Sequence, residues 1–176
     1  MVVLPKLSAA APHLRRKKIM SKVLIALNDS PSALNAVQYV ARQFAKSGDV
    51  NVNLVHVLPN LPAVFWDEGH ILSDKEKQDR KKMVDAWLDA QKARMEPLFR
   101  KAVGLLTEKG MTASSISTKF VSDSTDAADS ILEEARDGNY EIVVVGRSHH
   151  SAKHLLGAIA GKIANHGSGV VVTIVE

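Results

Sequence analysis

Short, almost wholly apolar runs alternate along the chain with longer stretches in which apolar residues recur at helical spacing. The run at 22–27 is too continuous for a half-exposed strand and is typical of a strand buried on both faces. Ser30 and Pro31 then predict a helix start, because serine is a favoured cap and proline fits the first turn. The helical spacing continues to Phe44, and Gly48 closes this first strand–helix unit.

The same alternation continues to the end of the chain. Further strands are predicted at 50–58, 114–121, 141–145 and 169–175, and further helices at 74–109, 125–136 and 152–165. Pro97 predicts a kink or a split in the longest helix, because proline cannot supply the backbone N–H that the helix needs there. A β-α order that repeats in this way favours one α/β domain, an open five-stranded parallel sheet with helices on both faces.

Composition excludes several classes of protein. The chain has no cysteine, which rules out disulfides, thiolate metal sites and a cysteine nucleophile, and which suits the reducing cytoplasm. Apolar residues make up 45% of the sequence, but no apolar run approaches the roughly 20 residues of a membrane-spanning helix. We therefore expect a cytoplasmic protein with no membrane partner.

Charge is unevenly distributed. The net charge of +4 comes from residues 1–19, which hold five lysines and arginines and no acid, so 18 basic and 19 acidic residues remain in 20–176. A domain this close to neutral does not favour nucleic acid as a partner. We expect 1–19 to be a flexible basic extension and 20–176 to be the folded domain. Met20 directly precedes the first strand, so it is an alternative start of the protein.

Two loops follow strands at the edge where open parallel sheets bind ligands, one at 28–30 and one at 146–150. Together with the segments 22–30, 54–58, 128–146 and 169–175, they resemble the universal stress protein family across nearly all of 20–176. The resemblance implies a Rossmann-like, adenine-nucleotide-hydrolase-like fold with strand order 3-2-1-4-5. It also implies a homodimer built through 169–175, whose apolar edge would need cover.

Nucleotide-binding members of this family are similar to one another in a signature of Gly, two residues, Gly, nine residues, Gly, then Ser or Thr. Glycines let backbone N–H groups approach phosphate oxygens, and the hydroxyl adds a donor. Here Gly146 matches the first glycine, and His149 stands at the second. Gly157 best matches the third but leaves the spacer two residues short, and Ala158 replaces the hydroxyl residue.

The first strand also departs from the family pattern, since Asn28 stands where an aspartate is usual and Asp29 where a glycine is usual. By resemblance, the residues that match an adenosine pocket are Ala26, Asn28 and Val57, and those that match a phosphate site are Gly146, Arg147, Ser148 and Gly157. Another interpretation stays open, in which Gly146 and Gly157 only permit a tight turn and close helix packing. Because of the departures, we expect ATP to bind weakly or not at all.

Other candidate sites carry less weight. Histidines gather at 149, 150, 154 and 166, but without a supporting carboxylate or cysteine they favour solvated side chains over a metal site. The stretch 157–163 resembles a P-loop superficially and lacks its Gly-Lys-Ser/Thr ending. Phe65 and Trp66 lie in a proline-flanked loop, where they could cover a ligand or tuck against the sheet.

No catalytic residue set emerges, so the sequence favours a non-catalytic stress-response protein that binds an adenine nucleotide such as ATP or AMP, or another anion, weakly. The sequence does not establish any cofactor. One alternative is a dimeric adaptor with no small ligand. The other is a slow ATPase that uses Asp29 and the loop after Gly146.

Overall fold

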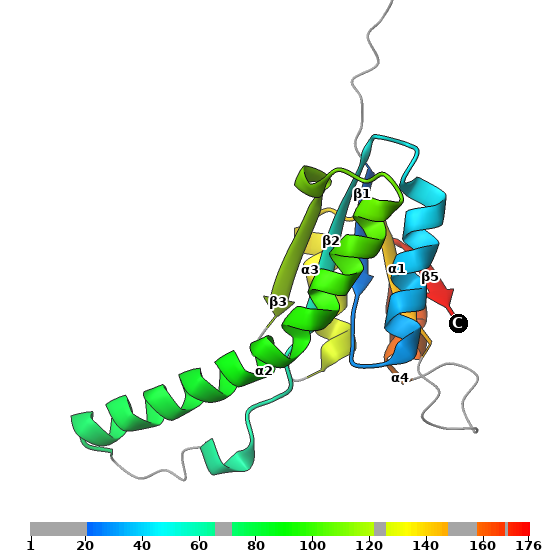
Figure 1. Ribbon diagram of the computed structural model, residues 1–176. Coiled ribbons are helices and arrows are strands. Elements are labelled where there is room, and N and C mark those ends of the chain that lie inside the picture. The colour runs from blue at the N-terminus through cyan, green and yellow to red at the C-terminus, as the bar shows by residue number, and fades with distance from the viewer. Residues whose placement is uncertain (1–20, 66–71, 122–125, 148–157, 168) are drawn as a thin grey trace, which may run out of the picture.

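The computed structural model describes residues 21–65, 72–121, 126–147, 158–167 and 169–176. Its five strands form one parallel sheet in the order β3-β2-β1-β4-β5 (Figure 1). The strands are β1 (Ser21–Ala26), β2 (Val50–Val57), β3 (Ile116–Val121), β4 (Ile142–Gly146) and β5 (Val171–Val175). The predicted fold class and strand order are confirmed.

Two helices cover each face of this sheet, as Figure 1 shows. They are α1 (Pro31–Phe44), α2 (Asp74–Glu108), α3 (Ala127–Asp137) and α4 (Ala158–His166), with short 3-10 turns η1 (Ala63–Phe65) and η2 (Ala113–Ser115). Helices α1 and α2 pack on one face, and α3 and α4 on the other. The predicted start of the last helix at 152 lies outside the described residues.

Strand alternation divides the interior into two apolar clusters. In β1, Val23 and Ile25 pack beneath α1 and α2, whereas Leu24 points to α3 and α4, and all three are fully buried. Because β1 lies at the centre of the sheet, both of its faces are covered, which explains its continuous apolar run. In the part of the chain that is described, no helix is long and apolar enough to cross a membrane.

Helix α2 extends well beyond the sheet. Its fully buried residues all lie in its second half, and they are Met95, Phe99, Ala102 and Leu106. The first half projects away from the domain, and the helix bends where it leaves the sheet (Figure 1). Helix α2 is continuous through Pro97, so of the two predicted outcomes, a kink or a split, the split is wrong. Packing of the second half on the sheet holds the helix together on both sides of the missing hydrogen bond.

The projecting half of α2 has two local supports. A capping box starts the helix, in which Ser73 and Glu76 bond to each other's backbone N–H. Further along, Phe65 of η1 lies against Trp87, with ring centroids 6.1 Å apart, and its carbonyl accepts from the Arg80 guanidinium. Phe65 therefore packs on α2, and not on the sheet as one prediction had it. Trp66 lies outside the described residues.

Candidate functional site

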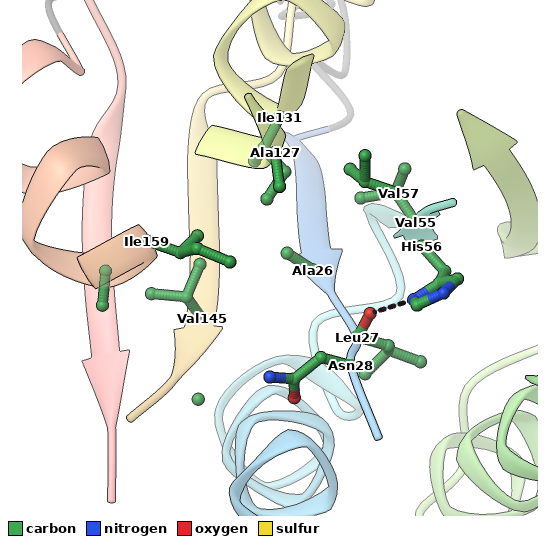
Figure 2. A pocket seen from close by; sticks show the side chains of 12 residues that line it. Ala26, Leu27, Asn28, Val55, His56, Val57, Ala127, Ile131, Val145 and Ile159 are labelled. Atoms are coloured by element: carbon green, nitrogen blue, oxygen red, sulfur yellow. Dashed lines mark hydrogen bonds between the residues drawn. The ribbon is translucent and has the colours of Figure 1, made fainter. Parts of the chain in front are cut away.

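A pocket opens where β1, β2 and β4 end, between the first turns of α3 and α4 (Figure 2). Its lining residues are Ala26, Leu27, Asn28, Val55, His56, Val57, Ala127, Ile131, Val145, Gly146, Ile159 and Ala160. The empty space, counted out to the solvent, is about 540 Å³. The carboxyl edge of the strands is where open parallel sheets bind ligands.

The pocket is mainly apolar. Val55 and Val145 form its floor and are buried, while Ile131 closes it from α3. Ile159 of α4 is 41% exposed and lies at the mouth, opposite Ala26 (Figure 2). Such walls suit a flat apolar or aromatic group more than a charged one.

Asn28 is the polar side chain that faces this space. Its Oδ1 accepts a 2.6 Å hydrogen bond from the Ser30 hydroxyl, and Ser30 in turn lies 2.9 Å from the Ser32 hydroxyl. Figure 2 shows the amide nitrogen of Asn28 on the side of Val145. The amide can therefore offer N–H donors, which an aspartate at this position could not. Ser30 stands at the N-cap of α1 as predicted, but its hydroxyl holds Asn28 and does not cap the helix.

Gly146 is needed for packing. A Cβ atom at this position would lie 2.5 Å from the Ser32 carbonyl oxygen and 2.9 Å from the Ala33 nitrogen, both in the first turn of α1. Only glycine lets β4 pass this close to another backbone. The close-packing interpretation of Gly146 therefore has a direct structural basis, whether or not a ligand also approaches the residue.

His56 contributes to the pocket from β2, but its imidazole is turned away from Ile159 and toward the Leu27 carbonyl (Figure 2). Nδ1 and that carbonyl oxygen are 2.8 Å apart, and the ring meets Phe120 edge-on at 6.2 Å. Burial lowers the pKa of His56, the bond to Leu27 opposes this, Arg94 lowers it further and Asp29 raises it. A neutral ring that donates from Nδ1 fixes the β1 end that carries Asn28.

Arg147, a predicted phosphate residue, bonds to a carboxylate of its own chain. Its guanidinium pairs with the Glu176 side chain, directly across from it where β4 and β5 end. The Glu176 carbonyl also accepts a 2.9 Å bond from Asn35 of α1. Arg147 is 25% exposed and its partner carboxylate is 68% exposed, so the pair lies at the surface beside β5.

Lys162 joins α4 to the start of α3. Its ammonium lies 2.9 Å from an Asp126 oxygen and 2.7 Å from an Asp129 oxygen. Asp126 also caps α3, accepting from the N–H groups of Ala128 and Asp129. The hydrogen bond to Lys162 lowers the pKa of Asp126, and those to Asp129 and then Asp126 raise the pKa of Lys162. Lys162 is the lysine of the P-loop-like stretch, and its partners are carboxylates.

The predicted site residues fall into three groups. Those that line the pocket are Ala26, Asn28, Val57 and Gly146. Those that are described but do not line it are Asp29, Arg147 and Ala158. Asp29 is exposed and pairs with Arg94 of α2 at 3.7 Å, and Ala158 is exposed at the start of α4. Ser148, His149 and Gly157 lie outside the described residues, as do His150 and His154.

Sequence reasoning missed most of the pocket walls. Four of these wall residues lie on the two helices of one face, and no sequence pattern indicated that they border a cavity: Ala127, Ile131, Ile159 and Ala160. The described part of the chain holds no group of three side chains that could bind a metal ion, and His166 is exposed at the end of α4.

An open parallel sheet with a pocket at the carboxyl ends of its central strands defines the Rossmann-like class of α/β proteins. Within that class, residues 20–174 match the model of the Universal stress protein family. The chain belongs to this family. No curated protein sequence matches the chain.

Solved structures agree with this fold. A universal stress protein from Lactobacillus plantarum is 14% identical, covering 89% of this chain and 98% of its own, with a TM-score of 0.62. One from Arabidopsis thaliana, with AMP bound, is 18% identical over 88% and 90% of the two chains, at a TM-score of 0.56. A universal stress protein from Archaeoglobus fulgidus, in complex with dAMP, is 17% identical. The match covers 90% of this chain and 99% of that one, with a TM-score of 0.53.

Proposed function

We propose that this protein is a non-catalytic member of its family that binds an adenine nucleoside or nucleotide, with modest affinity, in the pocket beside Asn28. The observation that carries the proposal is the pocket itself, an apolar slot with one amide side chain at the ligand edge of the sheet. Relatives of the same fold were crystallised with AMP and dAMP, which share the adenine base.

Two measurements test this proposal. Mass spectrometry of small molecules released from freshly purified, denatured protein should detect an adenine compound, and calorimetry should give a dissociation constant for it. Ala26→Leu should abolish binding, because three added carbons would fill the slot between Val55 and Val145. Ala86→Leu, at an exposed position on α2, makes the same change far from the pocket and should leave binding intact. If Ala26→Leu and Ala86→Leu bind the adenine compound equally well, the ligand does not bind in this pocket.

A slow ATPase has less support. Asp29, the acid that such chemistry would use, is exposed, does not line the pocket and is paired with Arg94. We propose that the protein has no useful hydrolytic rate. Phosphate release from ATP above background would refute this if it were lost in Asp29→Asn and kept in Asp85→Asn on α2. The protein would then be an ATPase that uses Asp29.

We also propose that the protein forms a homodimer through β5. Sheet order leaves β5 at one edge, and Val171 at its start is 61% exposed. An apolar edge strand with unpaired backbone groups invites a second strand, which a two-fold axis would supply. The same surface would serve the adaptor alternative, in which the dimer alone is the functional form.

Light scattering tests the dimer. Wild type should have twice the mass of the chain at micromolar concentration, and Val171→Lys should be monomeric, because a lysine on an edge strand opposes pairing. Thr118→Lys, exposed on the opposite edge strand β3, is the matched control and should stay dimeric. A monomeric wild type would refute the proposal.

A further inference from the structure

We infer that the protein has a second ligand site, at the amino ends of β1, β2 and β3, which takes a small hydroxylated molecule with one oxyanion group. Sugar phosphates and sugar acids both have this chemistry. The site is a polar cavity between η2, at this end of the sheet in Figure 1, and Tyr140, which follows α3. It lies at the opposite end of the strands from the pocket beside Asn28, so the inference does not rest on the proposed function.

The sequence of β2 departs from the rule for inner parallel strands. Such a strand is normally apolar on both faces, and β2 lies between β1 and β3. Val55 follows the rule and is fully buried in the apolar cluster under α3 and α4. Because residues two apart on a strand share a face, Asn53 and Asn51 lie on the same side as Val55. The first half of β2 therefore presents amides where a core would need apolar side chains.

The neighbouring strands are polar at the same level. The ladder pairs Lys22 of β1 with Asn51, and Ser117 of β3 with Asn53. These four side chains line one cavity, on a single face of three adjacent strands. Polar groups that are withdrawn from water cost free energy unless they are hydrogen-bonded. A patch of this kind inside a sheet is therefore more easily explained by a polar ligand than by the needs of folding.

The hydrogen bonds of Asn53 set out the groups that meet a ligand. Asn53 is 6% exposed, its Nδ2 donates to the Tyr140 hydroxyl at 2.7 Å, and its Oδ1 accepts from the Ser117 hydroxyl at 3.2 Å. Since the Tyr140 oxygen accepts this bond, its own proton is a donor for another group. The Ser117 oxygen donates and so keeps lone pairs that can accept. The network thus presents one donor and one acceptor at fixed positions beside the cavity.

Lys22 supplies positive charge to the same place. Its ammonium donates to the Gly138 carbonyl at 2.9 Å and lies 6.0 Å from the centroid of the Tyr140 ring. An ammonium has three N–H donors, so the bond to Gly138 holds the group beside Tyr140 and leaves two donors for a ligand. A cation next to a phenol proton favours an oxyanion, because hydrogen bonds to a charged acceptor are the stronger kind.

The remaining polar groups of the cavity suit hydroxyls. Ser114 and Ser115 line it from η2, and the Ser115 hydroxyl donates to the Thr112 carbonyl at 2.8 Å, which leaves its oxygen as an acceptor. The amide of Asn51 offers both donors and an acceptor. A ligand with several hydroxyls can use such a mixture. With Lys22 and Tyr140 at one oxyanion, the cavity matches a small sugar phosphate or sugar acid.

A nuclear magnetic resonance titration of the full chain tests this inference, with glucose 6-phosphate and gluconate as probes. The side-chain amide signals of Asn51 and Asn53 report on this cavity, and that of Asn28 reports on the other pocket. We expect at least one probe to shift the first two signals saturably at moderate salt. A response to one probe alone would support the site and identify its oxyanion.

Glucose is the control ligand. It lacks the oxyanion and should bind about tenfold more weakly or less, because it loses the charge-assisted bonds to Lys22. If neither charged probe moves the signals of Asn51 and Asn53, or if glucose binds as tightly as they do, the inference is wrong.

Two variants locate the site. Lys22→Met should weaken binding of the charged probe about tenfold, whereas Lys101→Met, exposed on α2, should leave it unchanged. Equal weakening by both would show general attraction to basic side chains and refute the site. Asn51→Leu should abolish binding by filling the cavity, and Asn60→Leu, at an exposed position between β2 and η1, should not. If Asn51→Leu binds as well as Asn60→Leu, the probe binds outside this cavity and the inference fails.

Discussion

Replacing Gly146 with alanine tests whether packing alone requires glycine at the end of β4. The added Cβ would lie 2.5 Å from the Ser32 carbonyl oxygen, well inside contact distance. That neighbour is backbone in the first turn of α1, fixed by Pro31 and by the 3.1 Å bond from the Ala33 N–H to Ser30, so it cannot swing away as a flexible side chain could. Overpacking of this kind costs about 1–3 kcal/mol of the free energy of unfolding.

The assay is urea unfolding without ligand, supported by a melting temperature that should fall by roughly 2–4 °C per kcal/mol in a domain of this size. Gly104→Ala in α2 is the control. No atom lies within 4 Å of a Cβ there, and alanine is favoured over glycine inside a helix by about 0.5–1 kcal/mol, so this variant should gain stability. If Gly146→Ala unfolds at the same urea concentration as wild type, α1 can shift to make room for the added Cβ. Packing would then not require glycine at this position, and a ligand that approaches the backbone would be the remaining reason for it.

Three further predictions concern polar groups. Tyr140→Phe removes the acceptor of a 2.7 Å bond from the amide of Asn53, which is 6% exposed, so urea unfolding should show a loss of about 1–3 kcal/mol; an unchanged midpoint would contradict this. The lowered pKa of His56 means that the unfolded chain binds more protons below about pH 6.5, so wild type should lose stability from about pH 7 to 5 more steeply than His56→Asn. The lowered pKa of Asp126 should give wild type an advantage over Asp126→Asn that is present above about pH 4 and disappears as the pH falls further; parallel pH profiles would contradict it.

Local patterns predicted the elements well where one physical rule dominated. The first helix runs from Pro31 to Phe44 as predicted, because proline sets its start and its apolar stripe packs continuously on the sheet. The third strand was predicted from residue 114 but starts at Ile116. Residues 113–115 form a 3-10 turn, in which the Ser115 hydroxyl bonds to the Thr112 carbonyl at 2.8 Å. Serine and threonine side chains form local hydrogen bonds with the backbone in this way, and these bonds compete with strand pairing. The pattern of apolar residues, from which the strand was predicted, does not show such bonds.

The candidate site was harder to predict because its chemistry depends on partners that are distant in sequence. Arg147 was expected at a phosphate from its place after Gly146, but the register of β4 and β5 sets it opposite Glu176, 29 residues away. Lys162 likewise meets Asp129, 33 residues before it, only because α3 and α4 pack side by side. The capping box at Ser73 was not predicted, although serine followed by glutamate three residues later is visible in the sequence.

The two halves of a nucleotide site depend on different parts of this fold. The walls that suit a base stand at strand ends, where the ladder pairs Ala26 with Val55 and Val145 and so fixes their spacing regardless of ligand. Phosphate contacts in such folds come from the loops after the strands, whose sequence the ladder does not constrain. A chain can therefore lose a loop glycine or the hydroxyl of a phosphate signature while its base pocket stays intact, whereas Gly146, the first glycine of the signature, is held by packing against α1. For this protein, the fit of the apolar slot is thus a better guide to the ligand than the match to the signature.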